Sequence, residues 1–377
     1  MQPSENSPVL GDIGEQGLLK LLHQFCTPGL VGDDAACLEL KDWDRKSLVV
    51  TTDVLVDGVH FSEKTTSPED AGWRAAAANL SDLAAMGASA IAIVVGLSLK
   101  SDTPVSWVER LYQGMTACLE EYDTAIAGGD VVRSPVITIA ITAFGRVDPE
   151  RTIRRGAAKP GDAIVVTGYH GASRAGLELL LHPELRETSS QRDLSQRDLS
   201  QSNLSQSNLS QSNLSQSNLS QSDRNFFIQA HQRPRPRLDV LPILQNLNSA
   251  NSPDSSNYSA VRIAGMDSSD GLADAIFQIA RASGCGARID RAKLPIPEAL
   301  SQWVGVETAL DWALYGGEDF ELVLCLPSES AEELVKKLGS PAAIVGTITK
   351  DTGICLTDST GAKSDRYLSL DKGFEHF

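Results

Sequence analysis

Carboxylate and hydroxyl side chains gather in five short segments of this sequence, each following an apolar run or lying beside a glycine. The segments are Asp33-Asp34, Thr51-Thr52-Asp53, Asp82, Gly129-Asp130 and Asp267 to Asp270. Neighbouring carboxylates repel each other unless solvent or a cation screens their charge. Oxygen ligands suit hard divalent cations, and a glycine lets the backbone approach a phosphate closely. Together, the five segments predict a site at which several Mg²⁺ ions bind a polyphosphate.

Each segment alone is open to a simpler interpretation. The pair Asp33-Asp34 fits a solvated turn, and a polar group after an apolar run fits an ordinary strand end. Between Asp267 and Asp270, helix capping requires only one of the polar groups. Asp82 fits a solvent-facing acid, although the helix dipole disfavours an anion near a helix C-terminus. The predicted metal site therefore rests on all five segments occurring in one chain.

The first half of the chain predicts alternating strands and helices that would position these groups. An apolar strand at Val49-Val50 is expected to end at Thr51-Thr52-Asp53, and the turn at Asp57-Gly58 returns His60 to the same strand end. A helix is expected to begin at Ser67-Pro68, with an N-cap hydroxyl and a first-position proline, and to end at Gly87. The other expected elements are helices at 13–25 and 105–122 and strands at 91–97, 124–127 and 136–144.

The second half predicts strands at 163–167, 261–266, 320–326, 342–348 and 354–356, and helices at 173–181, 272–283 and 329–338. The chain of 377 residues is long enough for two cores, so we expect an N-terminal domain at 1–149 and a C-terminal domain at 150–377.

A five-residue repeat interrupts the second half. It reads QRDLS twice, QSNLS four times and then QSD, over residues 191–223. Five residues advance a helix by about 500°, so the leucines form no single stripe, and in a strand they would alternate between faces. We therefore expect 188–224 to be a disordered insertion and not a solenoid, and we expect 248–259 to be a second polar loop.

Composition excludes several classes of function. The formal net charge of −16 argues against nucleic acid or an anionic membrane as partner. No segment reads as a signal peptide, and no run approaches the ~20 apolar residues of a membrane span. The six cysteines form no C-x-x-C pair and fit reduced thiols, which favours a cytoplasmic protein. Because Walker, dinucleotide-binding and protein-kinase motifs are all missing, we expect metals to hold most of the nucleotide.

The ordered motifs resemble those of the thiamine-monophosphate kinase family, part of a superfamily that includes aminoimidazole ribonucleotide synthetase. The matching segments are GDDAA at 32–36, Thr51-Thr52-Asp53 with His60-Phe61, Asn79 to Gly87, Gly128-Gly129-Asp130, Lys159 to Asp162, Asp267 to Leu272 and Gly316 to Asp319. The resemblance covers almost the whole chain except the repeat and the second polar loop.

This resemblance implies a two-domain fold like that of aminoimidazole ribonucleotide synthetase, with an α/β N-terminal domain that pairs in a homodimer and an α+β C-terminal domain. It implies ATP-dependent phosphorylation of thiamine monophosphate to the diphosphate, with several Mg²⁺ ions and ATP as co-substrate. By motif, the implied metal ligands are Asp33, Thr51, Thr52, Asp53, Asp82, Asp130, Asp267 and Asp270. The implied ATP-binding residues are Tyr112, Gly129, Asp130, Arg155 and Ser269. The implied substrate-binding residues are His60, Glu318 and Phe374.

Two alternatives compete with this interpretation. One is another ATP-using enzyme of the same superfamily, but the selenium and hydrogenase branches are expected to carry a reactive cysteine at one end, which Cys26 and Cys355 do not match. The other is a non-catalytic nucleotide-binding protein, against which the acids in all five segments argue. No side chain is expected to act as a general base, because the attacking phosphate oxygen is already anionic near neutral pH.

Overall fold

The structure is a computed structural model that describes residues 17, 20, 32–39, 46–183, 219–247 and 260–370. Most of the predicted helix at 13–25, the repeat as far as residue 218, the polar loop at 248–259 and Phe374 lie outside the described residues. No helix in the described ranges combines the length and apolarity needed to cross a membrane.

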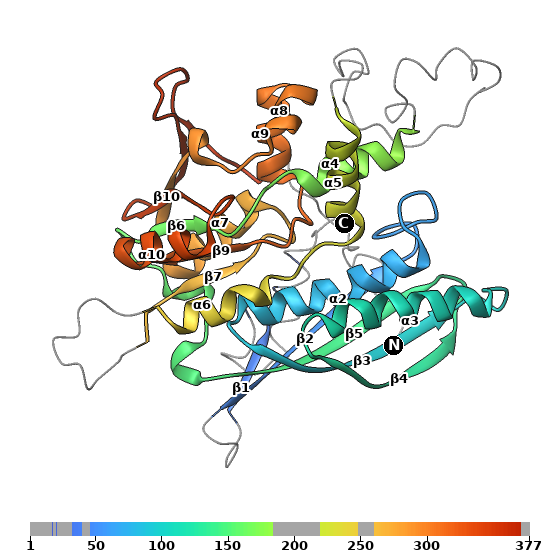
Figure 1. The fold of residues 1–377 in the computed structure, drawn as a ribbon. Coiled ribbons are helices and arrows are strands. Elements are labelled where there is room, and N and C mark those ends of the chain that lie inside the picture. Colours follow the sequence, from blue (N-terminus) through green and yellow to red (C-terminus); the bar gives the residue numbers. More distant parts are fainter. Residues whose placement is uncertain are drawn as a thin grey trace, which may run out of the picture.

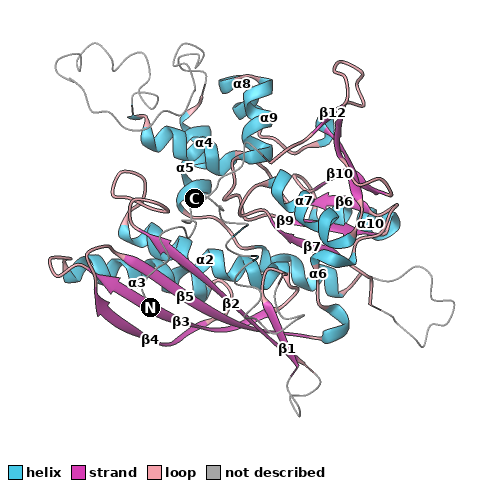
Figure 2. Cartoon of the chain, turned by 180° about the vertical axis from the view of Figure 1, so that it is seen from behind, coloured by secondary structure: helices cyan, strands magenta, loops and turns pink. Residues whose placement is uncertain are grey.

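The first half forms a five-stranded mixed sheet in the order β1-β2-β5-β3-β4. Its strands are β1 (Ala36–Glu39), β2 (Ser47–Val56), β3 (Ser89–Leu99), β4 (Ala125–Arg133) and β5 (Thr138–Val147). Helices α2 (Pro68–Ala85) and α3 (Val105–Glu120) lie together on one face of this sheet, and no other described element covers the opposite face (Figures 1 and 2). The sheet therefore has one buried and one open face.

Helix α2 forms as the sequence predicts. Its N-cap Ser67 accepts a hydrogen bond from the backbone N–H of Asp70, and Pro68 occupies the first helical turn. Almost the whole helix is buried, because it lies between the first sheet and the second half of the chain (Figure 1). Small residues permit this packing: a Cβ on Gly72 would lie 1.9 Å from the carbonyl oxygen of Leu111 on α3. Groups on α2 are thus held rigidly at the centre of the molecule.

Two predicted strand ends prove to be strand interiors. β2 continues to Val56, so Thr51-Thr52-Asp53 lie in its middle, and β4 contains Gly128-Gly129-Asp130. The predicted strands stopped at Thr51 and at Gly128, but backbone pairing with neighbouring strands continues through both positions. The prediction for the next turn is confirmed, since the backbone N–H groups of Gly58 and His60 bond back to Phe61 and Val56.

The second half forms a seven-stranded mixed sheet in the order β12-β11-β8-β10-β6-β9-β7. Its strands are β6 (Ala163–Val166), β7 (Ala264–Asp267), β8 (Gly286–Asp290), β9 (Leu322–Leu326), β10 (Ala343–Thr349), β11 (Ile354–Thr357) and β12 (Arg366–Tyr367). Helix α7 (Leu272–Ser283) packs with one set of alternating strand residues, and α10 (Ser328–Leu338) packs with the other set. Helices therefore cover both faces, as the continuously buried strands β6, β7 and β9 require.

A third layer of helices caps the second half (Figure 1). It consists of α4 (Ala172–Leu181), α5 (Gln221–Gln232), α8 (Glu298–Val304) and α9 (Val306–Tyr315), which share a core around Phe227, Trp303 and Trp312. The short helix α6 (Leu241–Gln245) instead lies in the core between the two halves, where it contacts α10.

The predicted end of the disordered insertion at Arg224 is wrong. Ser220 and Asp223 form a capping box that starts α5, and the side chains of Leu219 and Arg224 are buried.

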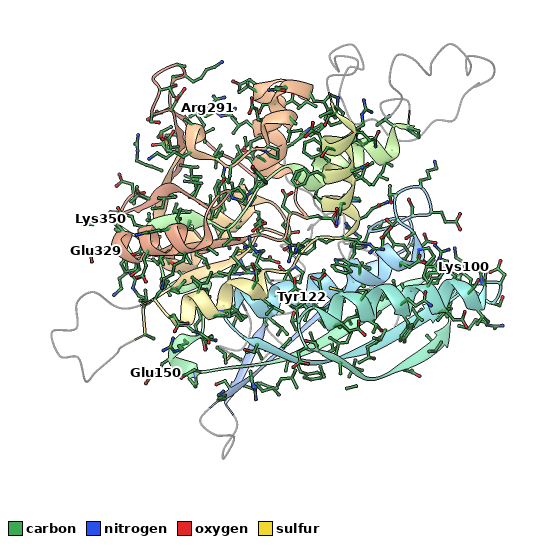
Figure 3. All side chains as sticks on the ribbon, in the orientation of Figure 1. Lys100, Tyr122, Glu150, Arg291, Glu329 and Lys350 are labelled. Atoms are coloured by element: carbon green, nitrogen blue, oxygen red, sulfur yellow. The ribbon has the colours of Figure 1, made fainter. Side chains whose placement is uncertain are left out.

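Long charged side chains, such as those of Lys100, Glu150, Arg291, Glu329 and Lys350, lie at the periphery of the molecule (Figure 3).

Candidate active site

Three acidic side chains from distant parts of the sequence converge between the two sheets. Asp34 precedes β1, Asp82 lies near the C-terminal end of α2, and Asp267 ends β7. One carboxylate oxygen from each lies within 4.8 Å of the other two. We call these three residues the acid cluster. Carboxylates at this separation can bind one divalent cation together.

Hydroxyl groups fix the orientation of the cluster. Thr51 on β2 donates hydrogen bonds to the carboxylate of Asp82 and to the backbone oxygen of Asp34. Ser81 on α2 donates to Oδ2 of Asp267 at 2.6 Å, and the Ser269 hydroxyl donates to Oδ1 at 2.7 Å. The cluster is therefore held by contacts that cross from the first half of the chain to the second.

Burial and mutual repulsion perturb these acids. The pKa of Asp34 is raised to about 7, because burial and the charge of Asp267 outweigh the opposing effect of Arg155. Burial, followed by the charges of Asp53 and Asp267, raises the pKa of Asp82 well above its ordinary value. Burial and Asp267 also raise the pKa of Asp53 to about 6. Without a cation, the site therefore favours protonated carboxyl groups.

A strongly basic group borders the cluster. Arg155 forms two hydrogen bonds with Asp34, of 3.2 and 3.3 Å, and its backbone N–H donates to Asp33 at 2.8 Å. Burial tends to lower the pKa of Arg155, but the charge and hydrogen bonds of Asp34, together with the charges of Asp267 and Asp33, outweigh burial and raise it. Asp33 itself pairs with Arg154 at 3.2 Å. The predicted ligand Asp33 thus contacts arginines, while its neighbour Asp34 joins the acid cluster.

The structure separates the other predicted metal and ATP residues into several places. Thr51 and Asp53 face α2, whereas the side chain of Thr52 is on the open face of the sheet and donates to the Ile141 carbonyl oxygen. Gly129 and Asp130 lie on the edge strand β4, separated from β2 by β5 and β3, about 14 Å away at ordinary strand spacing.

Asp130 is exposed and shares a cross-sheet row with the exposed Val54. Asp270 is exposed just before α7, while Tyr112 is half-buried on α3. Among the described residues, neither Asp130 nor Asp270 belongs to the acid cluster.

Burial tends to raise the pKa of Glu318, but the charge of Arg74 and its hydrogen bond help to lower that pKa overall, and the nearby His60 makes a smaller contribution in the same direction. The Nδ1 atom of His60 accepts a hydrogen bond of 3.1 Å from the backbone N–H of Val56, which places the proton of the neutral ring on Nε2. The backbone N–H of Glu318 donates to the carbonyl oxygen of Ser269 at 2.6 Å. The loop that carries Glu318, a predicted substrate-binding residue, therefore adjoins the loop that carries Ser269, a predicted ATP-binding residue.

Sequence reasoning missed several polar residues of this region. Asn79 accepts from the backbone N–H of Asp53, Ser81 holds Asp267, and Arg74 pairs with Glu318. All three lie on α2 and are buried. A signal for these residues was present in the sequence. They are polar residues in an alanine-rich helix, and the small residues around them already indicated that the helix packs closely against its neighbours.

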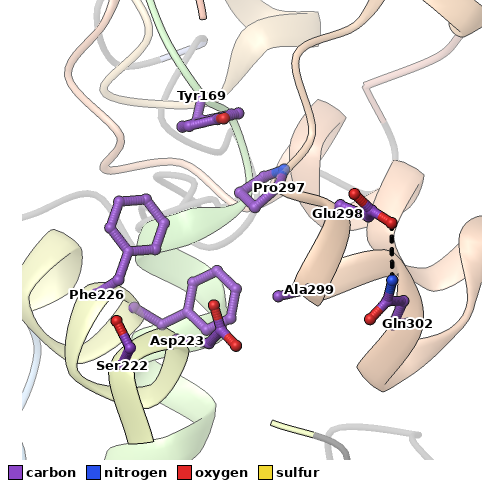
Figure 4. Close-up of a pocket in the computed structure, with 9 residues that line it drawn as sticks. Tyr169, Ser222, Asp223, Phe226, Pro297, Glu298, Ala299 and Gln302 are labelled. Atoms are coloured by element: carbon purple, nitrogen blue, oxygen red, sulfur yellow. Dashed lines mark hydrogen bonds between the residues drawn. The ribbon is translucent and has the colours of Figure 1, made fainter. Parts of the chain in front are cut away.

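A separate cavity of about 550 Å³ lies at the start of α5 and α8. It is lined by aromatic and apolar residues, among them Tyr169, Phe226, Phe227 and Pro297, together with the acids Asp223 and Glu298 (Figure 4). None of the predicted site residues among the described ones lines it. The acid cluster, and not this cavity, brings together the groups that can bind a metal and a phosphate.

Comparison with protein families agrees with this architecture. Residues 32–147 match the model for the N-terminal domain of AIR synthase related proteins, and residues 253–358 match the model for their C-terminal domain. Residues 193–223 match the model for pentapeptide repeats in eight copies. The last of these matches covers the repeat that interrupts the second half.

Curated relatives match over nearly the full chain. The thiamine-monophosphate kinase of Synechococcus elongatus is 45% identical over 98% of both chains, and that of Escherichia coli K12 is 35% identical over 92% of this chain and 91% of the relative.

Among solved structures, "AaThiL complexed with AMPPCP and TMP" matches with a TM-score of 0.74 and 29% identity, covering 99% of this chain and 100% of that one. A hydrogenase maturation protein from E. coli matches at 20% identity with a TM-score of 0.59, covering 94% of this chain and 97% of that one, which shows a shared fold. With the curated relatives, these matches show that the chain belongs to the thiamine-monophosphate kinase family.

Proposed function

We propose that this chain transfers the γ-phosphoryl group of ATP directly to thiamine monophosphate and so forms thiamine diphosphate. The observation that carries the proposal is the convergence of Asp34, Asp82 and Asp267 beside Arg155, in a chain of this family. A metal-binding group next to a partly buried arginine matches what phosphoryl transfer requires, which is positioning and charge compensation.

Several Mg²⁺ ions are part of the proposal. The donor set fits them: the acid cluster, with Thr51 and Asp53 beside it, offers only oxygen ligands. Burial, and after it the charges of neighbouring carboxylates, raise the pKa values of Asp34 and Asp82, and a bound cation would offset both effects. Bound Mg²⁺ would neutralise phosphate charge and align the reacting groups. Asp33, Thr52, Asp130, Asp267 and Asp270 keep the ligand roles proposed from their motifs. Asp34 is added to them, because it lies in the acid cluster and its neighbour Asp33 does not.

The remaining site residues are proposed to bind and orient. Arg155 and Ser269 lie beside the acid cluster and would contact ATP phosphates, and Gly129, Asp130 and Tyr112 complete the proposed ATP site. His60, Glu318 and Phe374 would contact the thiamine moiety. Since the phosphate acceptor is already anionic, His60 acts in binding through its Nε2–H and not as a base.

Pairing of two chains is proposed through the open face of the first sheet. That face carries the exposed Val54 and Asp130, and β4 is exposed along nearly its whole length. A sheet face and edge left open in this way favour association with another chain. Such pairing would also explain how Gly129 and Asp130, remote from the acid cluster of their own chain, reach an ATP site.

We also propose where the two domains divide and in which compartment the protein is located. We propose the domain division at residue 149, supported by the end of β5 at Val147 and by the first family match ending there. A cytoplasmic location is supported by the free thiols of all five described cysteines, Cys37, Cys118, Cys285, Cys325 and Cys355, which suit a reducing compartment.

The test is product identification. Purified protein with ATP, Mg²⁺ and thiamine monophosphate is expected to form thiamine diphosphate and ADP in equal amounts, and chelation of the metal is expected to stop the reaction. ATP with a chiral γ-phosphate distinguishes direct transfer from a phosphoenzyme, because one in-line step inverts the configuration at phosphorus. Nucleotide binding without any diphosphate would instead support the non-catalytic alternative.

A further inference from the structure

A buried arginine on α2 contacts the carboxylate proposed to bind the thiamine moiety. Nη2 of Arg74 lies 2.6 Å from Oε1 of Glu318, and Nη1 donates to the backbone oxygen of His231 at the end of α5. The Arg74 side chain is 3% exposed and that of Glu318 is 35% exposed. Glu318 can therefore meet a ligand, while Arg74 lies behind it.

The loop that carries Glu318 has an unusual backbone. Glu318 and Phe320 have φ angles of +58° and +52°, in the left-handed region that residues other than glycine rarely adopt. Such strain persists only where surrounding contacts hold it, and it occurs often at ligand-binding sites. Arg74 on the side chain and Ser269 on the backbone N–H are two of those contacts.

His231 completes the surroundings of the carboxylate. Its Nδ1 lies 3.1 Å from the Ser173 hydroxyl and 3.7 Å from Oε2 of Glu318, beyond hydrogen-bond length for the second contact. Burial, assisted by Arg74, lowers the pKa of His231 to about 3, so this ring is neutral. Arg74 is thus the close cation that compensates the charge of Glu318.

A purely stabilising role does not account for Arg74. Its buried Nε atom has no hydrogen-bond partner among the described residues, which makes the side chain a costly way to join two elements. An ionised carboxylate only accepts hydrogen bonds and attracts cations. Thiamine monophosphate offers both kinds of partner, in its exocyclic amino group and its positively charged thiazolium ring.

We infer that Arg74 is a positioning residue for substrate recognition: it fixes the Glu318 carboxylate, in its ionised form, toward the cationic and amino-bearing part of thiamine monophosphate. This inference rests on the proposed function. It assigns Arg74 a part in binding the phosphate acceptor and none in binding ATP or in the transfer step.

The test compares Arg74→Gln with Arg74→Lys, which keeps the charge, and with Arg233→Gln. Arg233 is a matched control, because it also joins the end of α5 to α2, through Asp70 and Trp73, without contacting Glu318. For Arg74→Gln we expect KM for thiamine monophosphate to rise about tenfold or more, while KM for ATP and kcat change by less than about threefold. Arg74→Lys should recover most of the loss, and Arg233→Gln should keep both KM values.

A double-mutant cycle and a binding measurement separate the possible failures. In a Glu318→Gln background, Arg74→Gln should add little, because Arg74 acts through that carboxylate. Calorimetric titration of thiamine monophosphate without ATP should show the same weakening. Three results would overturn this inference without touching the proposed function. They are an unchanged KM for thiamine monophosphate in Arg74→Gln, additive effects in the cycle, and equal rises in both KM values with a lower melting temperature. A wild-type protein that forms no thiamine diphosphate would overturn the proposed function as well.

Discussion

The hydroxyl of Ser81 on α2 donates a hydrogen bond of 2.6 Å to Oδ2 of Asp267 at the end of β7, and both side chains are buried. This contact joins the two sheets at the acid cluster. Ser81→Ala would leave a buried carboxylate oxygen without this donor, at a cost of about 1–3 kcal/mol. We expect the Mg²⁺ concentration for half-maximal activity to rise several-fold, because Asp267 loses its fixed orientation. The control is Ser330→Ala, which removes the hydroxyl of another buried serine, on α10. An unchanged Mg²⁺ requirement in Ser81→Ala would count against the role of this contact.

Asp33 and Asp34 should differ in their importance for catalysis. Asp34 belongs to the acid cluster, while Asp33 accepts hydrogen bonds from Arg154 and from the backbone of Arg155. Asp34→Asn is expected to lower kcat about a hundredfold or more, and Asp33→Asn to lower it by less than about tenfold. Steady-state kinetics at saturating Mg²⁺ measures both. The reverse order of effects would return Asp33 to the position that the motif resemblance gave it.

The stability of the metal-free protein should fall as pH rises. Asp34 has a pKa of about 7 in the folded chain against an ordinary value of 3.8, and Asp53 a pKa of about 6. Between these limits Asp34 and Asp53, with Asp82 and Asp319, bind more protons in the folded than in the unfolded state. The buried neutral His170 and His231 act in the opposite direction below their ordinary pKa of 6.5, but they are fewer, so the free energy of unfolding decreases with pH. We expect the melting temperature in a chelator to decrease from pH 5 to pH 7.5.

Added Mg²⁺ should raise the melting temperature more at pH 7.5 than at pH 5, because metal binding requires ionised carboxylates. Asp34→Asn, which cannot titrate at this position, should show a weaker pH dependence. A melting temperature that stays level or rises with pH in chelator would contradict the raised pKa values.

We expect that the repeat can be shortened without effect only if the deletion ends before Leu219, where the described packing begins. Deleting 190–214 removes pentads alone and is expected to leave activity and melting temperature nearly unchanged, since their leucines share no common face. Deleting 190–222 also removes the buried Leu219 and the N-cap Ser220 of α5. That deletion should lower stability by a few kcal/mol. Equal melting temperatures for the two deletions would show that the start of α5 contributes nothing.

Local signals in the sequence predicted many elements correctly. Ser67-Pro68 marked the start of α2, and Gly284, with φ of +64°, marked the end of α7. Local signals failed where tertiary pairing decides the outcome. The segment Thr51-Thr52-Asp53 reads as a strand end because it is polar, yet β2 continues, with Thr51 and Asp53 facing the site and Thr52 facing outward.

Three of the five predicted segments contribute a side chain to the acid cluster, but in the segment Asp33-Asp34 the sequence did not identify which residue does so. Asp33 and Asp34 are neighbours, and only the fold decides which of them meets Asp82 and Asp267. Likewise the last pentad differs little from the others, but the Asp223 that follows it completes the capping box of α5. Arg74 carried no motif signal, because its importance comes from Glu318, which lies more than two hundred positions later in the chain.

The most direct measurement is the rate of thiamine diphosphate formation by Asp82→Asn, compared with wild type at saturating thiamine monophosphate, ATP and Mg²⁺. Asp82 is the member of the acid cluster that accepts from Thr51 and lies at the centre of the molecule. If the cluster binds the metals that carry phosphoryl transfer, the variant should fold and yet lose about a hundredfold or more of the wild-type rate. A folded Asp82→Asn variant that forms thiamine diphosphate at the wild-type rate would contradict the account.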